Sequence, residues 1–312
     1  MAIVVDAIKS LQLVVQEEVA SLQLNQYPML SRLPKKVTGQ KSIKWNANVG
    51  GAGVTGEATT TSVSAYTEDA VIGAFLAIGA NRLRHSFQLQ KEDIAEAKNA
   101  GKGVLRDLFG FEIQSGIRAI MESMSGYVYT GTGLVGLGAV VANAAYAGID
   151  PGTYTAWSCF TSTNGSNRAL TAGLLLDMEV GIARKGGNFT AIYTTPEIVA
   201  KYKLLFAANV AINNILPGGQ ADLGFSGVTY AGRPIIQDPY CPANSMFFVN
   251  EPEVALYSFG QNNTESVNDM QFAITSLPSS NPDAENYALY CKPQLKVHTR
   301  NKGVAALLNI TQ

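Results

Sequence analysis

Gly131, Gly133 and Gly136, in the stretch GTGLVGLG, have the G-x-G-x-x-G spacing of a dinucleotide-binding loop. In such a site the glycines follow a strand and open a helix, and an acidic residue ends the next strand about 20 residues later. Here the next candidate strand, TYTAWSCFTS, ends in hydroxyl side chains without an acid, and the glycines follow a long predicted helix. We therefore interpret them as a tight turn that leaves this helix. A nucleotide-dependent oxidoreductase remains an alternative hypothesis.

Other residue types that carry out chemistry are sparse. The chain has two histidines: His85 shares a strand face with apolar residues, which indicates packing, and His298 lies in the polar stretch KVHTR. No third ligand stands at a useful spacing for a metal site. Asp177 and Glu179 are typical of a solvated helix face. We expect no catalytic residue, no metal and no cofactor, and hence no enzyme.

The composition points to a protein whose surface is covered by other molecules. Of 312 residues, 46% are hydrophobic and only 15% are charged, against about 25% charged in typical domains. The net charge of −1 predicts no bulk attraction to nucleic acid or membrane. The N-terminus has no signal-peptide pattern, and no apolar run is long enough to span a membrane. The sparse cysteines indicate free thiols in a reducing compartment: Cys159, Cys241 and Cys291.

The predicted elements follow a distinctive order. Helical periodicity over residues 2–22 indicates an amphipathic N-terminal helix. SIKWNANVG alternates apolar and polar residues, as a half-buried strand does, and begins a long hairpin with a glycine-rich tip. NRLRHSFQL forms another strand, and residues 91–124 form one helix of roughly 50 Å at about 1.5 Å per residue. Four internal glycines predict close packing along this helix or a bend. Mixed helices and strands follow, and then closing strands.

The charges are arranged in blocks along the chain. Between Glu18 and Glu57 there are five bases and no acid, whereas between Arg233 and Lys292 there are seven acids and no base. These blocks describe either two solvated surfaces or a basic hairpin that lies on an acidic sheet of a neighbouring copy. The second hypothesis predicts assembly that depends on salt. The acids are Asp238, Glu251, Glu253, Glu265, Asp269, Asp283 and Glu285.

Several stretches in this order resemble the major capsid proteins of tailed bacteriophages, the Hong Kong 97-type family. AVIGAFLAIGANRLRHSFQLQKEDIAEA looks like the returning arm of that family's E-loop and the strand entering its spine helix. GYVYTGTGLVGLGAVV is similar to the glycine-rich passage after that helix. TAIYTTPEIVAKYKLL and SGVTYAGRPIIQDPYCPANSMFFVNEPEVALY resemble parts of its axial domain. The resemblance covers about residues 35–312.

The resemblance implies an α+β chain with the Hong Kong 97-type capsid fold. Its parts would be an N-terminal arm at 1–37, an extended β-hairpin E-loop and the strand entering the spine helix at 38–90, a peripheral domain with the long spine helix at 91–126 and 255–312, and an α/β axial domain at 127–254. Copies would assemble as hexamers and pentamers into an icosahedral head around double-stranded DNA. An encapsulin-type nanocompartment shell is the alternative.

The resemblance also implies partners and contacts. Portal and scaffolding proteins, decoration or cement proteins, and non-specific contact with the packaged DNA are expected, and no membrane. A separate scaffolding protein is expected because only about 35 residues precede the hairpin. The protein would be assembled in the host cytoplasm and reside in the virion. Contact candidates between subunits are Lys41, Lys44, Trp45, Gly51, Gly53, Glu265 and Asp269.

Overall fold

The computed structural model describes residues 27–50, 70–78, 82–100, 102–207, 228–260, 265–267, 269–279 and 281–311. The predicted helix at 2–22 and the hairpin tip with Gly51 and Gly53 lie outside these residues. The chain divides into two compact units. The first contains residues 1–41, 77–136 and 255–296, and the second contains residues 42–76, 137–254 and 297–312.

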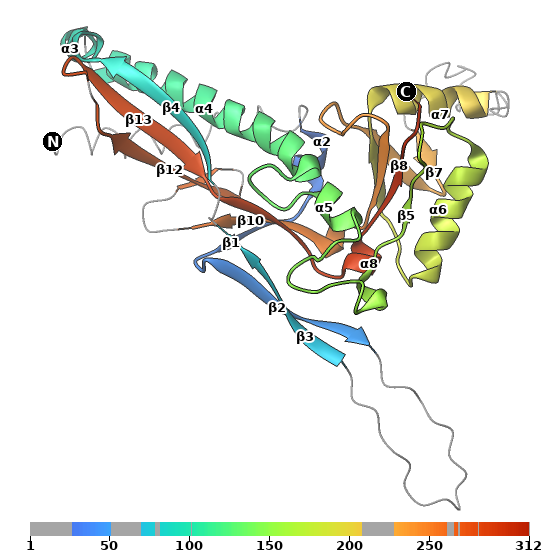
Figure 1. Ribbon diagram of the computed structural model, residues 1–312. Helices are drawn as coiled ribbons and strands as arrows, with labels where there is room; N and C mark the ends of the chain where they lie inside the picture. The colour runs from blue at the N-terminus through green and yellow to red at the C-terminus, as the bar shows by residue number, and fades with distance from the viewer. Residues whose placement is uncertain are drawn as a thin grey trace, which may run out of the picture. The chain divides into compact units, whose positions relative to one another are not determined.

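The first unit is built from a long helix and an antiparallel sheet (Figure 1). The sheet has the order β11-β12-β13-β4, and a smaller three-stranded sheet has the order β1-β10-β14. Phe109 of the long helix meets Tyr287 of the sheet edge to face, at 5.4 Å between ring centres. The elements of this unit are α2 (Pro28–Arg32), β1 (Lys35–Thr38), β4 (Leu83–Gln90), α3 (Lys91–Ala100), α4 (Lys102–Thr130), β10 (Val254–Phe259), β11 (Glu265–Val267), β12 (Met270–Leu277), β13 (Ala284–Cys291) and β14 (Pro293–Val297).

The predicted helix at 91–124 is present as two helices, α3 and α4, and it continues six residues further, to Thr130. Figure 1 draws α3 nearly end-on and α4 across the view, so the helix axis bends between them. Close packing, the other expectation, is present at Gly116. A Cβ there would lie 2.8 Å from Cδ2 of His85 and 3.1 Å from Cδ2 of Leu289. His85 is therefore a packed residue, as its strand face predicted.

The glycine motif forms the turn that ends α4. Gly131 and Gly133 have φ values of +89° and +78°, which residues with a Cβ adopt only at a cost. A Cβ on Gly136 would lie 2.5 Å from the nitrogen of Gly131 and 2.8 Å from the oxygen of Tyr129. The turn follows a 29-residue helix and leads to a five-residue helix, so it lacks the strand and the long helix of a dinucleotide site. The prediction of a tight turn is confirmed.

The second unit is organised around a six-stranded sheet of order β5-β15-β9-β6-β8-β7. Helices α6 and α7 cover one face of it, because Leu175 of α6 and Ile198 of α7 belong to the same buried cluster as Ile192 and Phe248 of the sheet. The elements are α5 (Leu137–Val141), η1 (Thr155–Trp157), β5 (Thr161–Ser162), α6 (Ala172–Arg184), β6 (Ala191–Thr194), α7 (Pro196–Ala207), β7 (Thr229–Tyr230), β8 (Arg233–Gln237), β9 (Ser245–Val249), η2 (Glu251–Glu253), α8 (Arg300–Gly303) and β15 (Val304–Leu308).

The last strand joins a different unit from the one expected. The sequence places residues 255–312 together with the long helix, but β15 pairs antiparallel with β9 and parallel with β5. Residues 297–312 therefore belong to the second unit. The physical reason is burial: Val304 to Leu307 are all buried in the six-stranded sheet. His298 lies in the bend after β14.

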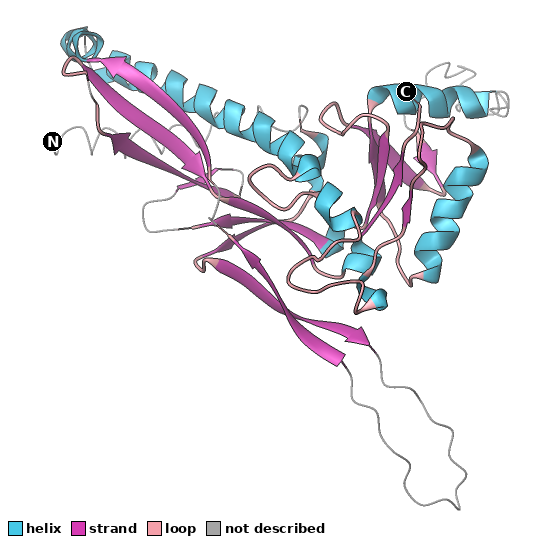
Figure 2. Cartoon of the chain, in the orientation of Figure 1, coloured by secondary structure: helices cyan, strands magenta, loops and turns pink. Residues whose placement is uncertain are grey.

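A long hairpin completes the second unit. It consists of β2 (Ser42–Gly50) and β3 (Ala70–Ala77), which form their own two-stranded sheet and run in opposite directions (Figures 1 and 2). The predicted alternation in β2 is confirmed, since its residues are alternately buried and exposed. A pair of strands needs further packing to be stable in water, so the contacts of this hairpin decide its role.

Candidate intersubunit surface

The two faces of the hairpin differ sharply in polarity and burial. The inner face is apolar and buried: Ile43, Trp45, Ala47 and Val49 of β2, with Ala74 and Leu76 of β3. The outer face carries exposed polar side chains from β2 and two exposed apolar side chains, Val71 and Phe75, from β3. Each of these two is 56% exposed. Apolar residues that stay this exposed beside a strand edge favour a partner that covers them.

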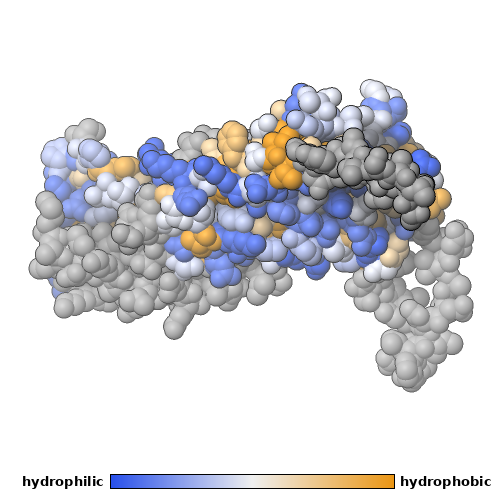
Figure 3. Space-filling view, turned by 90° about the horizontal axis from the view of Figure 1, so that it is seen from below, coloured by the Kyte–Doolittle hydropathy of each residue, from blue (hydrophilic) through white to orange (hydrophobic). Residues whose placement is uncertain are grey.

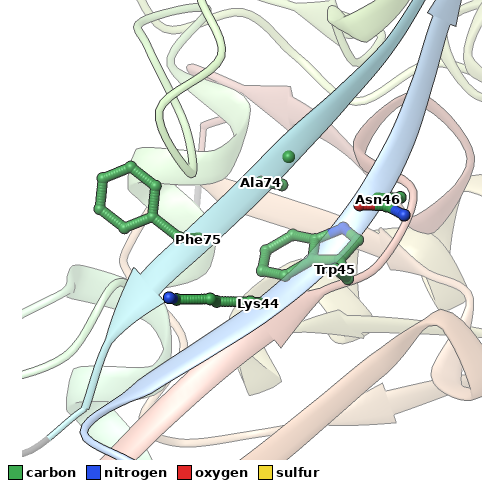
Figure 4. A pocket seen from close by; sticks show the side chains of 6 residues that line it. Lys44, Trp45, Asn46, Ala74 and Phe75 are labelled. Atoms are coloured by element: carbon green, nitrogen blue, oxygen red, sulfur yellow. The ribbon is translucent and has the colours of Figure 1, made fainter.

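The hairpin is hollowed between its two strands, and residues of both faces line the hollow. An open hollow of about 650 Å³ is lined by Lys44, Trp45, Asn46, Gly73, Ala74 and Phe75. Figure 4 shows Lys44 and Phe75 extending to the same side from the two strands. No atom lies within 4 Å of the position that a Cβ on Gly73 would take, so this glycine leaves the hollow open. The lining combines one cation, one amide and two aromatic rings.

Trp45 and Lys41 hold the base of the hairpin. The indole Nε1 of Trp45 donates a hydrogen bond to the carbonyl oxygen of His298, at 3.0 Å. Trp45 is 9% exposed, so it anchors the hairpin within its own unit more than it offers a surface to a partner. The carbonyl of Lys41 accepts a hydrogen bond from the nitrogen of Ile78, at 2.9 Å, and the Lys41 side chain is exposed.

The acidic contact candidates lie in the first unit. Glu265 is the first residue of β11 and stands opposite Phe272 of β12. Asp269 lies in the turn between these strands with φ of +61° and is exposed. Its carboxylate raises the pKa of Lys35, although burial has the larger effect and lowers that pKa overall. A base of the basic block thus already faces an acid of the acidic block within one chain.

The acidic block is divided between the two units. Asp238 is 1% exposed, and one carboxylate oxygen accepts a hydrogen bond from the nitrogen of Tyr240, at 2.9 Å. Asp238, Glu251 and Glu253 belong to the second unit, whereas the other four acids belong to the first. Adjacency in the sequence therefore does not place these acids in one unit, because the chain crosses between units after Val254.

Sequence reasoning missed Val71 and Phe75. The strand AVIGAFLA is apolar at every position except Gly73, and such a run is typical of a strand that is buried on both faces. The sequence of the neighbouring strand did contain a signal for the exposed face of β3. The pairing partner β2 alternates, and an alternating strand indicates a hairpin with one outer face. On the side of the molecule that Figure 3 shows, the apolar surface of the described residues lies in several separate areas among polar ones.

The described residues show little else that could carry chemistry. They contain no group of three or more His, Cys, Asp or Glu side chains that could hold a metal ion. Among them, no helix is both long and apolar enough to cross a membrane. Each of the three cysteines is buried as a free thiol, as their spacing predicted.

Comparisons with known proteins identify the fold. No protein-family model and no curated protein matches the sequence. Among solved structures, the chain resembles the capsid asymmetric unit of cyanophage A-1(L), with a TM-score of 0.78, 23% identity and coverage of 92% of this chain and 93% of that one.

More distant matches extend the same comparison. A chain of Mycobacterium phage Bobi matches with a TM-score of 0.58, 13% identity and 92% coverage of both chains. A chain of the holo-SrpI encapsulin complex from Synechococcus elongatus matches with a TM-score of 0.57, 14% identity, and coverage of 93% of this chain and 91% of that one. The chain has the fold of the major capsid proteins of tailed bacteriophages, as the sequence resemblance implied.

Proposed function

We propose that this chain is the major capsid protein of a tailed bacteriophage, and that it assembles as hexamers and pentamers into an icosahedral head that encloses double-stranded DNA. The observation that carries the proposal is the TM-score of 0.78 to a cyanophage capsid chain, over more than nine-tenths of both chains. A match of this extent includes residues of both units. No separate catalytic domain is needed to account for the described residues.

The hairpin gives the proposal a physical basis. Two strands alone are marginally stable, and the outer face of this pair leaves Val71 and Phe75 exposed. In a shell a neighbouring copy covers such a face, so the exposed edge is no longer free to pair wrongly. In this proposal residues 38–90 are the E-loop and its return strand, residues 91–126 and 255–296 lie in the peripheral domain, and residues 127–254 form the axial domain.

Charge pairs between copies are the next element of the proposal. Lys44 is exposed on the hairpin and Asp269 is exposed in the first unit. Together with Lys41, Gly51, Gly53 and Glu265, they are proposed contacts between neighbouring subunits, and Trp45 supports them from within its own chain. Exposed ion pairs each contribute about 0.2–1 kcal/mol. Such weak contacts suit assembly, because a misplaced subunit can dissociate.

Portal, scaffolding and decoration proteins belong to the proposal as partners, with the DNA bound non-specifically. A near-neutral chain favours this, because it does not hold the packaged DNA strongly. An encapsulin-type nanocompartment is the second candidate, supported by the encapsulin match at a TM-score of 0.57. The larger score of 0.78 for the cyanophage chain favours the phage head.

The test is assembly of the purified chain, alone and co-expressed with the scaffolding protein encoded next to it. Negative-stain microscopy and sedimentation should show closed shells of tens of nanometres, and their contents should distinguish DNA from a cargo enzyme. Lys44→Glu should weaken assembly, whereas Lys201→Glu, at another exposed lysine of the same unit, should not. Higher salt should weaken wild-type assembly. A chain that stays monomeric in every condition would contradict the proposal.

A further inference from the structure

We infer that the turn at residues 146–149 and the segment at residues 297–300 form one rigid platform, which fixes the direction in which the hairpin β2–β3 leaves the second unit. Arg300 is the positioning residue at its centre. All of these residues belong to the second unit. The platform itself does not depend on the proposed function. Its consequence for a shell, a defined direction for the base of the hairpin, does rest on it.

Arg300, the last residue of the segment at 297–300, holds the chain that leads into the turn. It is 0% exposed, and its Nε donates to the carbonyl oxygen of Val140 at 2.7 Å. Its Nη1 donates to the carbonyl oxygen of Ala144 at 2.8 Å, and its guanidinium carbon lies 5.9 Å from the centre of the Tyr146 ring. Burying a cation costs several kcal/mol unless hydrogen bonds compensate it. Burial lowers the pKa of Arg300, and Cys159 and Tyr146 oppose that shift.

The turn at 146–149 is rigid in its own right. Tyr146 and Ile149 exchange two backbone hydrogen bonds of 3.0 Å each. Ala147 and Gly148 between them have φ values of +55° and +80°, which is the geometry of a two-residue type I′ turn. The indole Nε1 of Trp157 donates to the oxygen of Tyr146 at 3.3 Å, and the two rings stack.

Tyr146 also bonds directly to the segment at 297–300. The backbone nitrogen of Val297 donates to the Tyr146 hydroxyl at 2.8 Å. The hydroxyl in turn points to the oxygen of Val297 at 3.4 Å. Burial raises the pKa of Tyr146 well above its usual range, so the hydroxyl keeps its proton at physiological pH. The turn and the segment are thus joined directly through Tyr146, and Arg300 fixes the chain just before the turn to the segment.

The hairpin is attached to this platform through both of its strands. The nitrogen of Phe75 in β3 donates to the oxygen of Ala147 at 3.1 Å. Trp45 in β2 donates from Nε1 to the oxygen of His298 at 3.0 Å; Figure 4 shows the two side chains on their separate strands. The Phe75 ring lies over Gly148, because a Cβ on this glycine would be 2.9 Å from Cε1 of Phe75.

Two attachments have a different mechanical effect from one. A hairpin held through a single strand can rotate about that contact, whereas one held through both strands can turn only if a hydrogen bond breaks. Because Tyr146 joins the two attachment points and Arg300 holds the chain just before the turn, loss of either residue should loosen the hairpin without any change in the hairpin sequence. This coupling separates a positioning role from ordinary core packing.

Hydrogen exchange of the full chain, read by mass spectrometry, tests the inference. The wild type and all variants are compared in the same assembly state. Trp45→Phe removes one hydrogen bond, and Tyr146→Phe removes the two that its hydroxyl makes with Val297. Both variants keep a ring, and Arg300→Lys keeps the charge but has fewer donors. Each should speed exchange of the β3 peptide containing Phe75 by about fivefold, the factor that corresponds to one net hydrogen bond.

The control is Tyr202→Phe, which removes a hydrogen bond of 2.9 Å from Tyr202 to the oxygen of Thr229 in the same unit and touches no part of the platform. It should leave β3 exchange unchanged. Exchange of the buried strand β9 reports global stability, so a variant that merely unfolds is recognised. Unchanged β3 exchange in both Tyr146→Phe and Trp45→Phe, with β9 still protected, overturns the inference. Neither result requires a shell, so failure of the proposed function is recognised separately by microscopy.

Discussion

Replacing either of two glycines of the first unit by alanine should change the stability of the chain, in opposite directions at the two positions. Alanine at Gly136 places a methyl group 2.5 Å from the nitrogen of Gly131 and 2.8 Å from the oxygen of Tyr129. Both neighbours are backbone atoms and cannot rotate away. Gly126, inside α4, has no neighbouring atom within 4 Å of the same position. Gly126→Ala should therefore gain helix propensity without a clash.

The magnitudes follow from these contacts. Overpacking costs about 1–3 kcal/mol, and contacts this short with backbone atoms place Gly136→Ala at the upper end. Gly131→Ala, at φ of +89°, should cost about 1–2 kcal/mol. Gly126→Ala should stabilise the chain by about 1 kcal/mol. Gly136→Ala and Gly126→Ala should thus differ by about 3–4 kcal/mol.

Urea denaturation of the full chain, followed by circular dichroism, measures this difference. The urea concentration at the unfolding midpoint should be highest for Gly126→Ala, lower for the wild type, lower again for Gly131→Ala and lowest for Gly136→Ala. Equal midpoints for the first and last variants would refute the packing argument. A dinucleotide that binds the wild type with micromolar affinity and fails to bind Gly133→Ala would instead support the nucleotide hypothesis. It would contradict the interpretation of these glycines as a structural turn.

Three further predictions follow from burial and exposure. Burial, a hydrogen bond to Glu179 and nearby charges raise the pKa of Tyr230 to about 12. The contribution of Tyr230 to the free energy of unfolding should therefore be complete below pH 10 and lost as pH rises toward 12. When unfolding is measured across that range, Tyr230→Phe should lose less stability than the wild type. The three buried thiols should resist Ellman's reagent at pH 8 in the native chain and all react in denaturant; one fast thiol in the native chain would contradict their burial. Val71→Ser should raise the critical concentration for assembly about fivefold, the equivalent of about 1 kcal/mol of lost apolar contact; an unchanged value would mean that no copy covers this face.

The local elements could be predicted from the sequence, because each depends on residues close together in the chain. The alternation of SIKWNANVG fixed which side chains of β2 are buried, and the periodicity from Lys91 predicted the long helix. The spacing of Gly131, Gly133 and Gly136 predicted a turn, since positive φ and close backbone contacts need glycine. The order of these elements was enough to indicate the capsid fold.

Contacts between distant segments could not be predicted in this way. Arg300 lies in the polar stretch KVHTRNKG, yet it is fully buried because carbonyls about 160 residues earlier in the chain accept its hydrogen bonds. Asp238 belongs to an acidic stretch, yet it is buried in a turn of its own. Which face of β3 points outward was likewise undecided, because both faces of that strand are apolar.

The sequence by itself determined the hairpin, the long helix and the glycine turn, because short-range patterns of polarity and backbone freedom specify such elements. The tertiary structure alone decided that β15 joins the six-stranded sheet, that the acids divide between two units, and that both strands of the hairpin are tied to residues 146–149 and 297–300. These features depend on which buried surfaces and unpaired backbone groups meet across long stretches of chain, and no local pattern carries that information.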